Sequence, residues 1–368
     1  MSTNRRQFIK ATAAGAVAAS LPLGTASADG HESEQRPLEI LVLGGTGFIG
    51  PHMVREALRR GHGVTLFNRG RTNNTLFPDL ERIIGDRSND LTGLEGRKWD
   101  VVVDNSGYMH HDVRASARLL APNVEHYIFI SSISAYDSMA APMYEDSPLA
   151  ALEDESITEF DWSLYGALKA VCERVVGEEM GEDRTTILRP TYIVGPGDHT
   201  DRFTYWPVRV RQGGRMLCPG SPEHPIQVID VRDLANFTID IVERRTTGAF
   251  NTTIPMGSYN MHQVLEDSQA VLATTVDPVW VNDEFVMQQQ LMGVLPIYHP
   301  ITGEYSHASS ASAERALAAG MHNRPVRETI RDLMTWWDTL SDERYANARF
   351  RMTAERETEL LAEWDALA

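Results

Sequence analysis

EILVLGGTGFIG, residues 39–50, is the stretch of sequence that decides the fold. Residues 39–43 are a short apolar run rich in β-formers, which is typical of a parallel strand buried on both faces. Glycines follow at once, and the pattern of residues 52–60 predicts a helix that ends at Gly61. Residues 64–67 are the next predicted strand. The glycines therefore lie at a strand-to-helix turn inside a β-α-β unit, the context in which such a motif binds a dinucleotide.

Each glycine of this turn has a physical task. Gly44 permits the tight turn, Gly47 lets the backbone approach a pyrophosphate, and Gly50 lets the helix pack closely against the strand. Backbone N–H groups at the helix N-terminus then meet the negative charge of the pyrophosphate. We therefore expect the cofactor cradle to consist of Gly44, Gly45, Thr46, Gly47, Phe48, Ile49 and Gly50.

The second predicted strand ends in NRGR, residues 68–71, and this end bears on the choice of cofactor. A protein selective for NAD usually has Asp or Glu here to hold the ribose 2′-hydroxyl, but residues 57–78 contain no acid. A guanidinium fork fits phosphate oxygens, so Arg69 and Arg71 favour NADP over the alternative, NAD. The other interpretation is that both arginines are solvated turn residues. Beyond the cradle, the expected cofactor contacts are Asn68, Arg69, Arg71, Asp86 and Asn105.

Three further strands are predicted, over residues 82–86, 101–103 and 127–130, and helical segments alternate with them. This alternation indicates an α/β fold, a doubly wound parallel sheet of the Rossmann type. Ligands of such sheets bind beyond the carboxyl ends of the strands. Asp86, which could accept a hydrogen bond from an adenine amino group, and Ser132 both lie at such ends.

Tyr165 and Lys169 lie four residues apart in a helical pattern, which places them on one face of the helix. A free phenol has a pKa of about 10 and is a poor base at neutral pH, but a neighbouring ammonium lowers that pKa. Ser132 could give a second hydrogen bond to a substrate oxygen. The three side chains can therefore move a proton while a nicotinamide moves a hydride. If the spacing of Tyr165 and Lys169 is considered by itself, the alternative is that the two residues simply lie on an ordinary helix face.

With these motifs, the chain resembles the extended short-chain dehydrogenase/reductases, and among them the NAD-dependent epimerase/dehydratase branch. Members carry GGxGFIG, a serine at the fifth strand end and YxxxK, which match residues 44–50, Ser132 and the pair Tyr165 and Lys169. The resemblance covers residues 38–255. It implies that Ser132, Tyr165 and Lys169 are the catalytic triad, that Tyr165 and Lys169 also contact the cofactor, and that the protein forms a homodimer.

Residues 188–190, 195–198 and 231–235 match later segments of the same family. Members that act on sugar nucleotides usually place an arginine seven residues before the aspartate of the last segment, against the substrate diphosphate. Here that position is Ile226, which argues against a nucleotide-diphosphate sugar. Parts of the sequence also resemble an atypical subgroup that includes chloroplast stem-loop RNA-binding proteins and many bacterial proteins.

We expect residues 38–190 to form the NAD(P)-binding domain and residues 191–368 a smaller, interleaved substrate-binding and C-terminal region. Aromatic faces suit the apolar face of a sugar ring, and a guanidinium suits an anionic group. The alternatives are that the aromatic residues of this region form a local hydrophobic cluster and that its arginines are solvated surface charges. The spacing of His and Cys residues predicts no metal site. The candidate substrate contacts are Ser132, Tyr205, Trp206 and Arg209.

Residues 1–28 resemble a twin-arginine export signal. Arg5 and Arg6 precede an Ala-rich apolar run, and residues 26–28 form a small-x-small cleavage site. The apolar run is too short and too rich in alanine to span a membrane stably. An amphipathic helix that belongs to the fold is the alternative. We expect residues 29–37 to be a spacer and the protein to be exported to the periplasm or the extracellular space, without stable membrane insertion.

The composition restricts the partners. The 368-residue chain has a formal net charge of −17, which repels phosphate backbones and anionic lipid heads, so nucleic acid is not an expected partner. Cys172 and Cys218 are the only two cysteines and make no disulfide framework, so both are expected to be buried thiols.

Three functions fit these observations. The leading hypothesis is an NAD(P)-dependent epimerase or oxidoreductase that acts on a hydroxyl or carbonyl of a sugar-like small molecule, with Tyr165 as acid/base. An epimerase returns its hydride to the same substrate, which suits a compartment where free cofactor is scarce. The alternatives are an NADP-dependent dehydrogenase or reductase of a non-sugar substrate, and a non-catalytic RNA- or ligand-binding member of the family. The fold alone does not choose among them.

Overall fold

A computed structural model describes residues 36–367 of the chain. The export signal assigned to residues 1–28 lies outside the described residues, as does most of the spacer assigned to residues 29–37. Within the described residues, 37–367 form one unit. Within residues 36–367, no helix has both the length and the apolar character that a membrane crossing requires.

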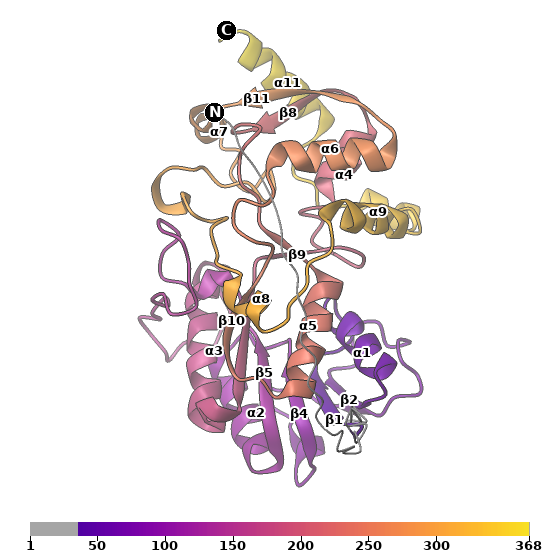
Figure 1. Cartoon of the computed structure of the whole chain (residues 1–368), viewed down its shortest axis with the longest axis vertical. Helices are drawn as coiled ribbons and strands as arrows, with labels where there is room; N and C mark the ends of the chain where they lie inside the picture. Colours follow the sequence, from indigo (N-terminus) through magenta and orange to yellow (C-terminus); the bar gives the residue numbers. More distant parts are fainter. Residues whose placement is uncertain (1–35, 368) are drawn as a thin grey trace, which may run out of the picture. The chain divides into compact units, whose positions relative to one another are not determined.

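A seven-stranded parallel sheet is the centre of this unit, and it confirms the predicted Rossmann-type fold (Figure 1). The strand order is β10-β6-β5-β4-β1-β2-β3, so the direction of winding reverses between β1 and β4. Ligands of doubly wound sheets bind at such a switch point. The strands are β1 (Glu39–Leu43), β2 (Gly63–Asn68), β3 (Arg82–Ile84), β4 (Trp99–Asp104), β5 (Val124–Ile130), β6 (Thr185–Pro190) and β10 (Gly248–Thr252).

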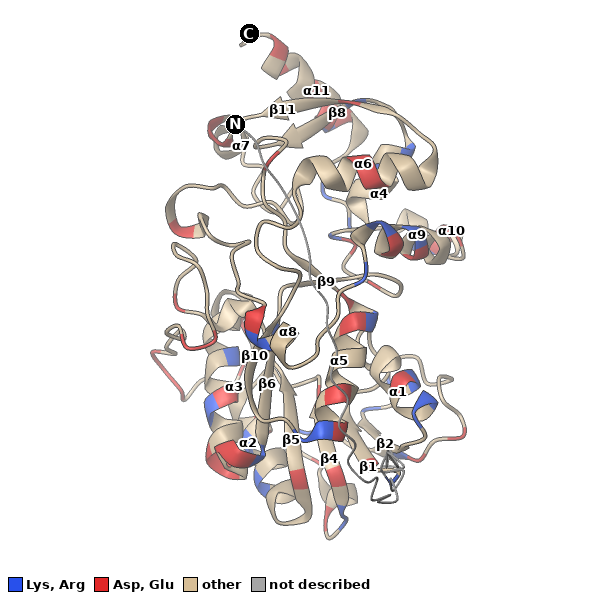
Figure 2. Cartoon of the chain, viewed as in Figure 1, with Lys and Arg blue, Asp and Glu red and all other residues tan. Residues whose placement is uncertain are grey.

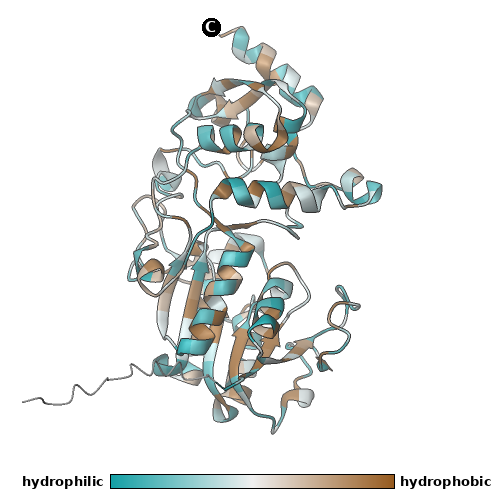
Figure 3. Cartoon of the chain, turned by 45° about the vertical axis from the view of Figure 1, so that its right-hand side comes forward, coloured by the Kyte–Doolittle hydropathy of each residue, from teal (hydrophilic) through white to brown (hydrophobic). Residues whose placement is uncertain are grey.

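Successive side chains of a strand point to opposite faces of the sheet, and in the central strands both sets are apolar. Helices therefore cover both faces of the sheet. Ile40 and Val42 of β1 join the core under α1 and α5, whereas Leu41 and Leu43 join the core under α2 and α3. Figure 3 shows hydrophobic strands between helices whose outer faces are hydrophilic, and Figure 2 shows charged residues on α1, α3 and α5. These helices are α1 (Gly50–Arg59), α2 (His110–Leu120), α3 (Tyr165–Met180) and α5 (Val231–Arg244).

Most of the remaining strands and α-helices build a second core beyond the carboxyl ends of the sheet's strands, around the buried Trp206. Two parallel strand pairs belong here: β8 (Gly214–Pro219) with β11 (Val276–Val281), and β7 (Tyr192–Val194) with β9 (Val228–Asp230). The helices of this core are α4 (Tyr205–Arg211), α6 (Met261–Leu272), α7 (Asp283–Gln288), α9 (Val326–Trp337), α10 (Asp342–Ala346) and α11 (Ala354–Asp365). Helix α8 (Glu314–Ala318) instead packs beside β10, in the core of the sheet. Short 3₁₀ helices are η1 (Thr92–Leu94), η2 (Ala121–Asn123), η3 (Ile133–Ala135), η4 (Trp162–Leu164), η5 (Glu182–Arg184) and η6 (Gly303–Tyr305).

The chain passes between the two cores more than once. After residue 190 it enters the second core, then returns with α5 to cover the sheet and with β10 to extend it beside β6. The interleaving expected from the sequence is therefore seen, and a cut at residue 190 does not separate the parts in space.

The contact between Gly50 and Gly45 offers a test of the fold. A Cβ on Gly50 would lie 2.5 Å from the Cα of Gly45, a backbone atom that moves only if the turn opens. We expect Gly50→Ala to lower the free energy of unfolding by about 1–3 kcal/mol in denaturant titrations. Gly47→Ala is the matched control, because a Cβ there would meet no atom within 4 Å. Equal losses at the two positions would contradict this account.

Candidate active site

The turn between β1 and α1 is bent by glycines in the left-handed region. Gly44 has a φ of +113° and Gly45 a φ of +87°, which residues with a Cβ rarely adopt. The N–H of Gly44 donates to the carbonyl of Phe67 at 2.9 Å and so ties the turn to the end of β2. The close approach of Gly50 then sets the first residue of α1 directly against the turn.

Gly47 lies at the open side of the turn. A Cβ on this residue would meet no atom within 4 Å, and the residue lines a cavity. Helix α1 begins at Gly50 without a side-chain cap and without an acidic residue in its first turn. Pro51 has no N–H, and the N–H groups of His52 and Met53 donate to the carbonyl of Ile49. In the first turn the N–H of Gly50 is therefore the donor left for an anion, together with the N–H groups of the glycine turn before it.

The cavity has a volume of about 1180 Å³ and extends from the glycine turn past α3 to the second core. Its size exceeds the 300–1,000 Å³ of ordinary small-molecule sites, as a dinucleotide plus a substrate would require. Every candidate site residue from the sequence lines it except three, which are Gly45, Trp206 and Arg209.

The end of β2 presents two arginines to this cavity. Asn68 shapes the turn: its Nδ2 donates to the carbonyl of Gly44 at 3.2 Å, and its Oδ1 accepts the N–H of Gly70 at 2.9 Å. Arg69 and Arg71 are exposed, line the cavity, and make no hydrogen bond or ion pair with another residue in the range 36–367. Their charges are therefore available to an anionic ligand.

The ends of β3 and β4 line the same part of the cavity. Asp86 accepts the N–H of Ser88 at 3.3 Å. Asn105 has a buried Nδ2 with no hydrogen-bond partner among the described residues. A buried amide donor needs an acceptor, and a ligand in the cavity can supply one.

These residues fit a dinucleotide on two independent observations. The space over Gly47 leaves the backbone open to a pyrophosphate beside the uncapped start of α1. The orphaned amide of Asn105 lies at the switch point of the sheet, between the ends of β1 and β4.

Ser132 and Tyr165 meet at the other side of the cavity. Ser132 follows β5 and caps η3 by accepting the N–H of Ser134 at 3.1 Å. Tyr165 is the first residue of α3, and its phenol hydrogen-bonds to the Ser132 side chain. The two hydroxyl groups predicted to act together are thus adjacent.

Lys169 lies one turn further along α3 and is buried. Its Nζ donates to the carbonyl of Gly107 at 2.9 Å and to that of Ile130 at 2.6 Å, and it lies 4.2 Å from the centre of the Phe129 ring. Burial lowers the pKa of Lys169 to about 8. Since an ammonium has three donors, one remains for a ligand.

The pKa of Tyr165 corrects one expectation. Burial raises this pKa, and the nearby phenol of Tyr108 raises it further, against the hydrogen bond from Ser132. Lys169 is not among the main causes of this shift, and its ammonium donates to two backbone carbonyls. In this structure the phenol of Tyr165 is a proton donor at neutral pH.

A buried ion pair that sequence reasoning missed supports the Ser132 loop. The carboxylate of Glu173, one turn beyond Lys169, binds the guanidinium of Arg189 at 2.6 Å and accepts a short hydrogen bond from Ser131. Arg189 is only 4% exposed and Glu173 6%. An arginine inside the apolar strand pattern of residues 185–190 was the available signal, because a buried arginine needs a partner.

A second buried ion pair lies beside the part of the cavity lined by Asp86 and Asn105. Arg87 binds Asp104 through two hydrogen bonds of 2.9 and 2.7 Å, and Tyr127 donates to the same carboxylate at 2.8 Å. The guanidinium of Arg87 holds the pKa of the Asp104 carboxyl below its usual value despite full burial. The loop after β3 is therefore held against the end of β4, and Tyr127 ties the middle of β5 to the same carboxylate.

Aromatic rings surround Tyr165, and the sequence did not reveal them. Tyr108 and Trp162 have ring centres 6.4 and 5.8 Å from that of Tyr165, and Phe160 packs edge-on against both. Trp162 is 74% exposed and lines the cavity. Its face is open to a ring or an apolar substrate group.

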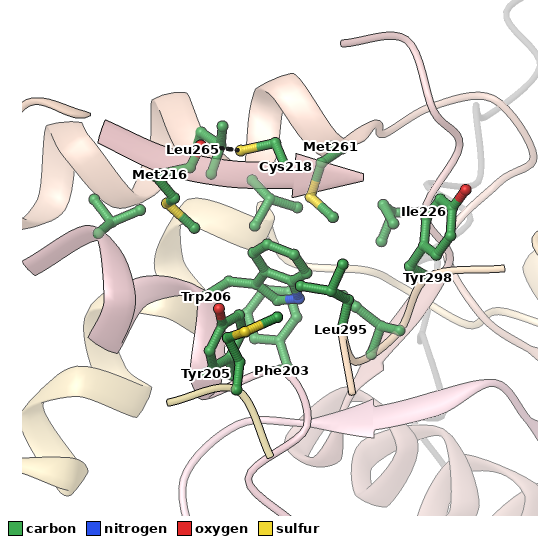
Figure 4. Close-up of a cluster of buried hydrophobic side chains, with 14 of the residues drawn as sticks. Phe203, Tyr205, Trp206, Met216, Cys218, Ile226, Met261, Leu265, Leu295 and Tyr298 are labelled. Atoms are coloured by element: carbon green, nitrogen blue, oxygen red, sulfur yellow. Dashed lines mark hydrogen bonds between the residues drawn. The ribbon is translucent and has the colours of Figure 1, made fainter. Parts of the chain in front are cut away.

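Two candidate substrate contacts are corrected by the structure. Trp206 is fully buried in the second core, where its indole N–H donates to the carbonyl of Pro296 at 3.0 Å (Figure 4). Arg209 is 9% exposed and pairs with Glu357 at 2.6 Å. Both hold the second core together, because α4 turns them inward. Tyr205 is also buried, at 4% exposed, but it forms part of the cavity wall.

The cysteines are buried, as the sequence predicts. Burial raises the pKa of the Cys172 thiol to about 12 and that of Cys218 further. In residues 36–367, no three His, Cys, Asp or Glu side chains are grouped to hold a metal ion.

Curated relatives of the chain have different activities. It is 28% identical over 239 residues to the chloroplast stem-loop binding protein of 41 kDa b from Arabidopsis thaliana, covering 58% of each chain. It is 28% identical over 217 residues to 2-alkyl-3-oxoalkanoate reductase from Stenotrophomonas maltophilia, covering 54% of this chain and 64% of the relative. The chain thus spans less than two thirds of the length of these relatives.

Solved structures share the fold at low identity. UDP-glucuronic acid 4-epimerase from Bacillus cereus, in complex with NAD, has a TM-score of 0.61 at 14% identity, covering 86% of this chain and 99% of that one. UDP-N-acetylglucosamine 4-epimerase from Methanobrevibacter ruminantium, in complex with UDP-N-acetylmuramic acid, has a TM-score of 0.60 at 19% identity, covering 82% and 99%.

Two family models match the sequence. The model of the twin-arginine translocation pathway signal matches residues 2–22, which indicates export across the membrane. The model of the NAD dependent epimerase/dehydratase family matches residues 40–257, more than half of the chain. With the Rossmann-type sheet and the glycine turn in place, the chain belongs to the NAD dependent epimerase/dehydratase family of enzymes.

Proposed function

We propose that the protein is an NAD(P)-dependent epimerase or oxidoreductase that acts on a hydroxyl or carbonyl group of a small, sugar-like molecule. The observation that carries this proposal is a single cavity that joins the glycine cradle to Ser132, Tyr165 and Lys169. The open aromatic face of Trp162 beside Tyr165 supports a ring-shaped substrate.

The chain's own groups would hold the cofactor along the carboxyl ends of the strands. The N-terminus of α1 and the cradle residues 44–50 would bind the pyrophosphate, and the remaining donor of Lys169 would bind the nicotinamide ribose. When bound, the nicotinamide accepts or supplies the hydride. Asn105 would use its buried amide donor on the same ligand.

Proton transfer falls to Tyr165. Its raised pKa keeps the phenol protonated, so the O–H can donate to a carbonyl oxygen as that carbonyl is reduced. In the oxidation of a hydroxyl, the deprotonated phenol would accept the proton of that hydroxyl. Ser132, which bonds the same phenol, would hold that oxygen with a second hydrogen bond. The buried pair of Glu173 and Arg189 positions the Ser132 loop through Ser131.

The second candidate function is an NADP-dependent dehydrogenase or reductase. Arg69 and Arg71, which have no protein partner in the described chain, would bind a 2′-phosphate, and the protonated Tyr165 suits reduction of a carbonyl. Two curated relatives carry such activities in their names: the 2-alkyl-3-oxoalkanoate reductase and a 3-beta-hydroxysteroid dehydrogenase from Mycolicibacterium neoaurum. The likeness to the chloroplast stem-loop binding protein keeps a non-catalytic RNA-binding role as an alternative, but the net charge of −17 and the complete triad disfavour it.

Export should leave a mature protein without residues 1–28, in the periplasm or outside the cell. N-terminal sequencing of the exported form checks this, and Arg5→Lys with Arg6→Lys should retain the protein in the cytoplasm because the paired guanidinium groups are lost. A mature chain that still begins near residue 1 would contradict the expectation. The family resemblance also leads us to expect a homodimer.

Tyr165→Phe should lower turnover by about 10²–10⁴-fold, because one acid–base group is removed. Turnover is followed by nicotinamide absorbance with paired sugars and their oxidised forms, and dinucleotide affinity by calorimetry should stay nearly unchanged. Tyr305→Phe is the matched control, since this tyrosine lines the same cavity and its hydroxyl makes no hydrogen bond in the described chain. Full activity of Tyr165→Phe would refute the proton-transfer role.

Cofactor choice is tested at Arg69 and Arg71. Hydrogen bonds to charged groups contribute roughly 1.5–3 kcal/mol, which corresponds to a preference for NADP of about ten- to a hundredfold. The double change Arg69→Ala with Arg71→Ala should abolish that preference in calorimetric titrations and barely alter NAD affinity. Lys98→Ala, at an exposed site away from the cavity, controls for the loss of positive charge. Tighter binding of NAD by the unmutated protein would refute the NADP assignment.

A further inference from the structure

Three guanidinium groups without a carboxylate partner line the substrate end of the cavity. They belong to Arg202, Arg349 and Arg351. Arg202 donates only to the hydroxyl of Thr200, at 3.1 Å, and its guanidinium carbon lies 4.8 Å from the centre of the Tyr192 ring. The side chains of Arg349 and Arg351 make no hydrogen bond or ion pair with the residues that the structure describes, and all three arginines are exposed.

The segment that carries two of these arginines is fastened to the cavity wall. Phe350, between Arg349 and Arg351, packs with ring-centre distances of 5.7 Å against both Tyr205 and Trp337. The aromatic anchor therefore fixes the backbone of the segment while the flanking charges line the cavity.

A buried carboxylate ties the same segment to the loop of Arg202. Asp201 is 2% exposed and has a φ of +57°, a left-handed conformation that is strained for a residue with a Cβ. One of its oxygens accepts the backbone N–H of Arg349 at 2.9 Å, and the other pairs with Arg344. Residues 202 and 349 are thereby held beside each other although 147 positions separate them.

The charge at this end of the cavity is net positive. Asp201 uses both oxygens on Arg344 and the N–H of Arg349. Asp198 is buried beside Arg202, makes no ion pair with it, and is bonded through one oxygen to Thr200. Like charges that share a site repel one another, and an anion placed among them removes that repulsion. In a chain of net charge −17, such a local positive cluster also steers anions into the cavity.

This cluster is distinct from the arginine that family members acting on sugar nucleotides usually place seven residues before the aspartate of the segment 231–235. Ile226 occupies that position and is buried in the second core at 1% exposed. Arg349 and Arg351 lie beyond residues 40–257, the part of the chain that matches the family model. Arg202 is near enough to the reacting end for its charge to oppose the raised pKa of Tyr165.

We propose that Arg202, Arg349 and Arg351 form an anion subsite that selects a substrate carrying a carboxylate or a phosphate on the same molecule as the reacting hydroxyl or carbonyl. The proposal rests on the proposed function, because it names the substrate class of that site. A planar guanidinium binds either anion through paired hydrogen bonds.

Arginine labelling tests the subsite on the full mature chain, saturated with its preferred dinucleotide. Phenylglyoxal modifies accessible guanidinium groups, and peptide mass spectrometry gives the rate at each arginine. The probes are D-glucuronate, D-glucose 6-phosphate and the neutral D-glucose, at equal ionic strength. We expect one or both anions, and not glucose, to slow labelling of the three arginines several-fold while Arg331, an exposed arginine of α9 outside the cavity, is unaffected. The more protective anion identifies the group as carboxylate or phosphate.

Equal slowing at Arg331, or no slowing by either anion, would overturn the proposal. Arg349→Gln with Arg351→Gln should weaken the protecting anion about tenfold or more, as expected for lost charge-assisted contacts, and Arg331→Gln should not. Dinucleotide affinity, measured by calorimetry, should be the same in both variants. If the dinucleotide binds and neutral substrates turn over without anion protection, the subsite is wrong and the proposed function stands. If no dinucleotide binds, the proposed function itself fails.

Discussion

The close approach of two backbone segments at Gly45 and Gly50 is the constraint on which the site depends. Because neither residue has a side chain, the start of α1 lies directly against the turn that ends β1. The helix N-terminus is thereby placed at the switch point of the sheet, where strand order reverses. Any larger residue at Gly50 would displace the helix and, with it, the N–H groups that face the cavity.

The other side of the cavity depends on buried charge rather than on small residues. The Glu173–Arg189 pair holds Ser131, and through it the loop of Ser132, against α3. Removing one member of such a pair leaves a buried charge without compensation, which costs several kcal/mol in typical proteins, about 3–5. The hydroxyl groups of the site are therefore positioned by the interior of the domain.

Much of the fold and of the nucleotide end could be predicted from sequence, because the interactions there are local. The strand run, the glycines and the Tyr165–Lys169 spacing each lie within a few residues of one another. Helix periodicity also placed Tyr165 and Lys169 on one face. It could not show that Lys169 is directed at two carbonyls, which come from the loop after β4 and from the end of β5.

The substrate end could not be predicted, because its contacts are long-range. Trp206 and Arg209 looked like ligand contacts, yet their partners Pro296 and Glu357 lie far along the chain and turn both residues inward. In the same way, only the fold shows that Asp201 holds Arg349 at the cavity. The composition shows only a net negative charge, so it could not reveal the local positive cluster of Arg202, Arg349 and Arg351.

The central claim is that the cavity holds one nicotinamide dinucleotide on the glycine cradle. Mass spectrometry of the purified mature protein, first native and then denatured, tests it most directly. The account predicts one dinucleotide per chain that is released intact on denaturation, and its loss in a Gly47→Trp variant that remains folded, because that side chain would fill the open space over the turn. A folded protein that carries no dinucleotide, and binds neither NAD nor NADP when titrated, would contradict it.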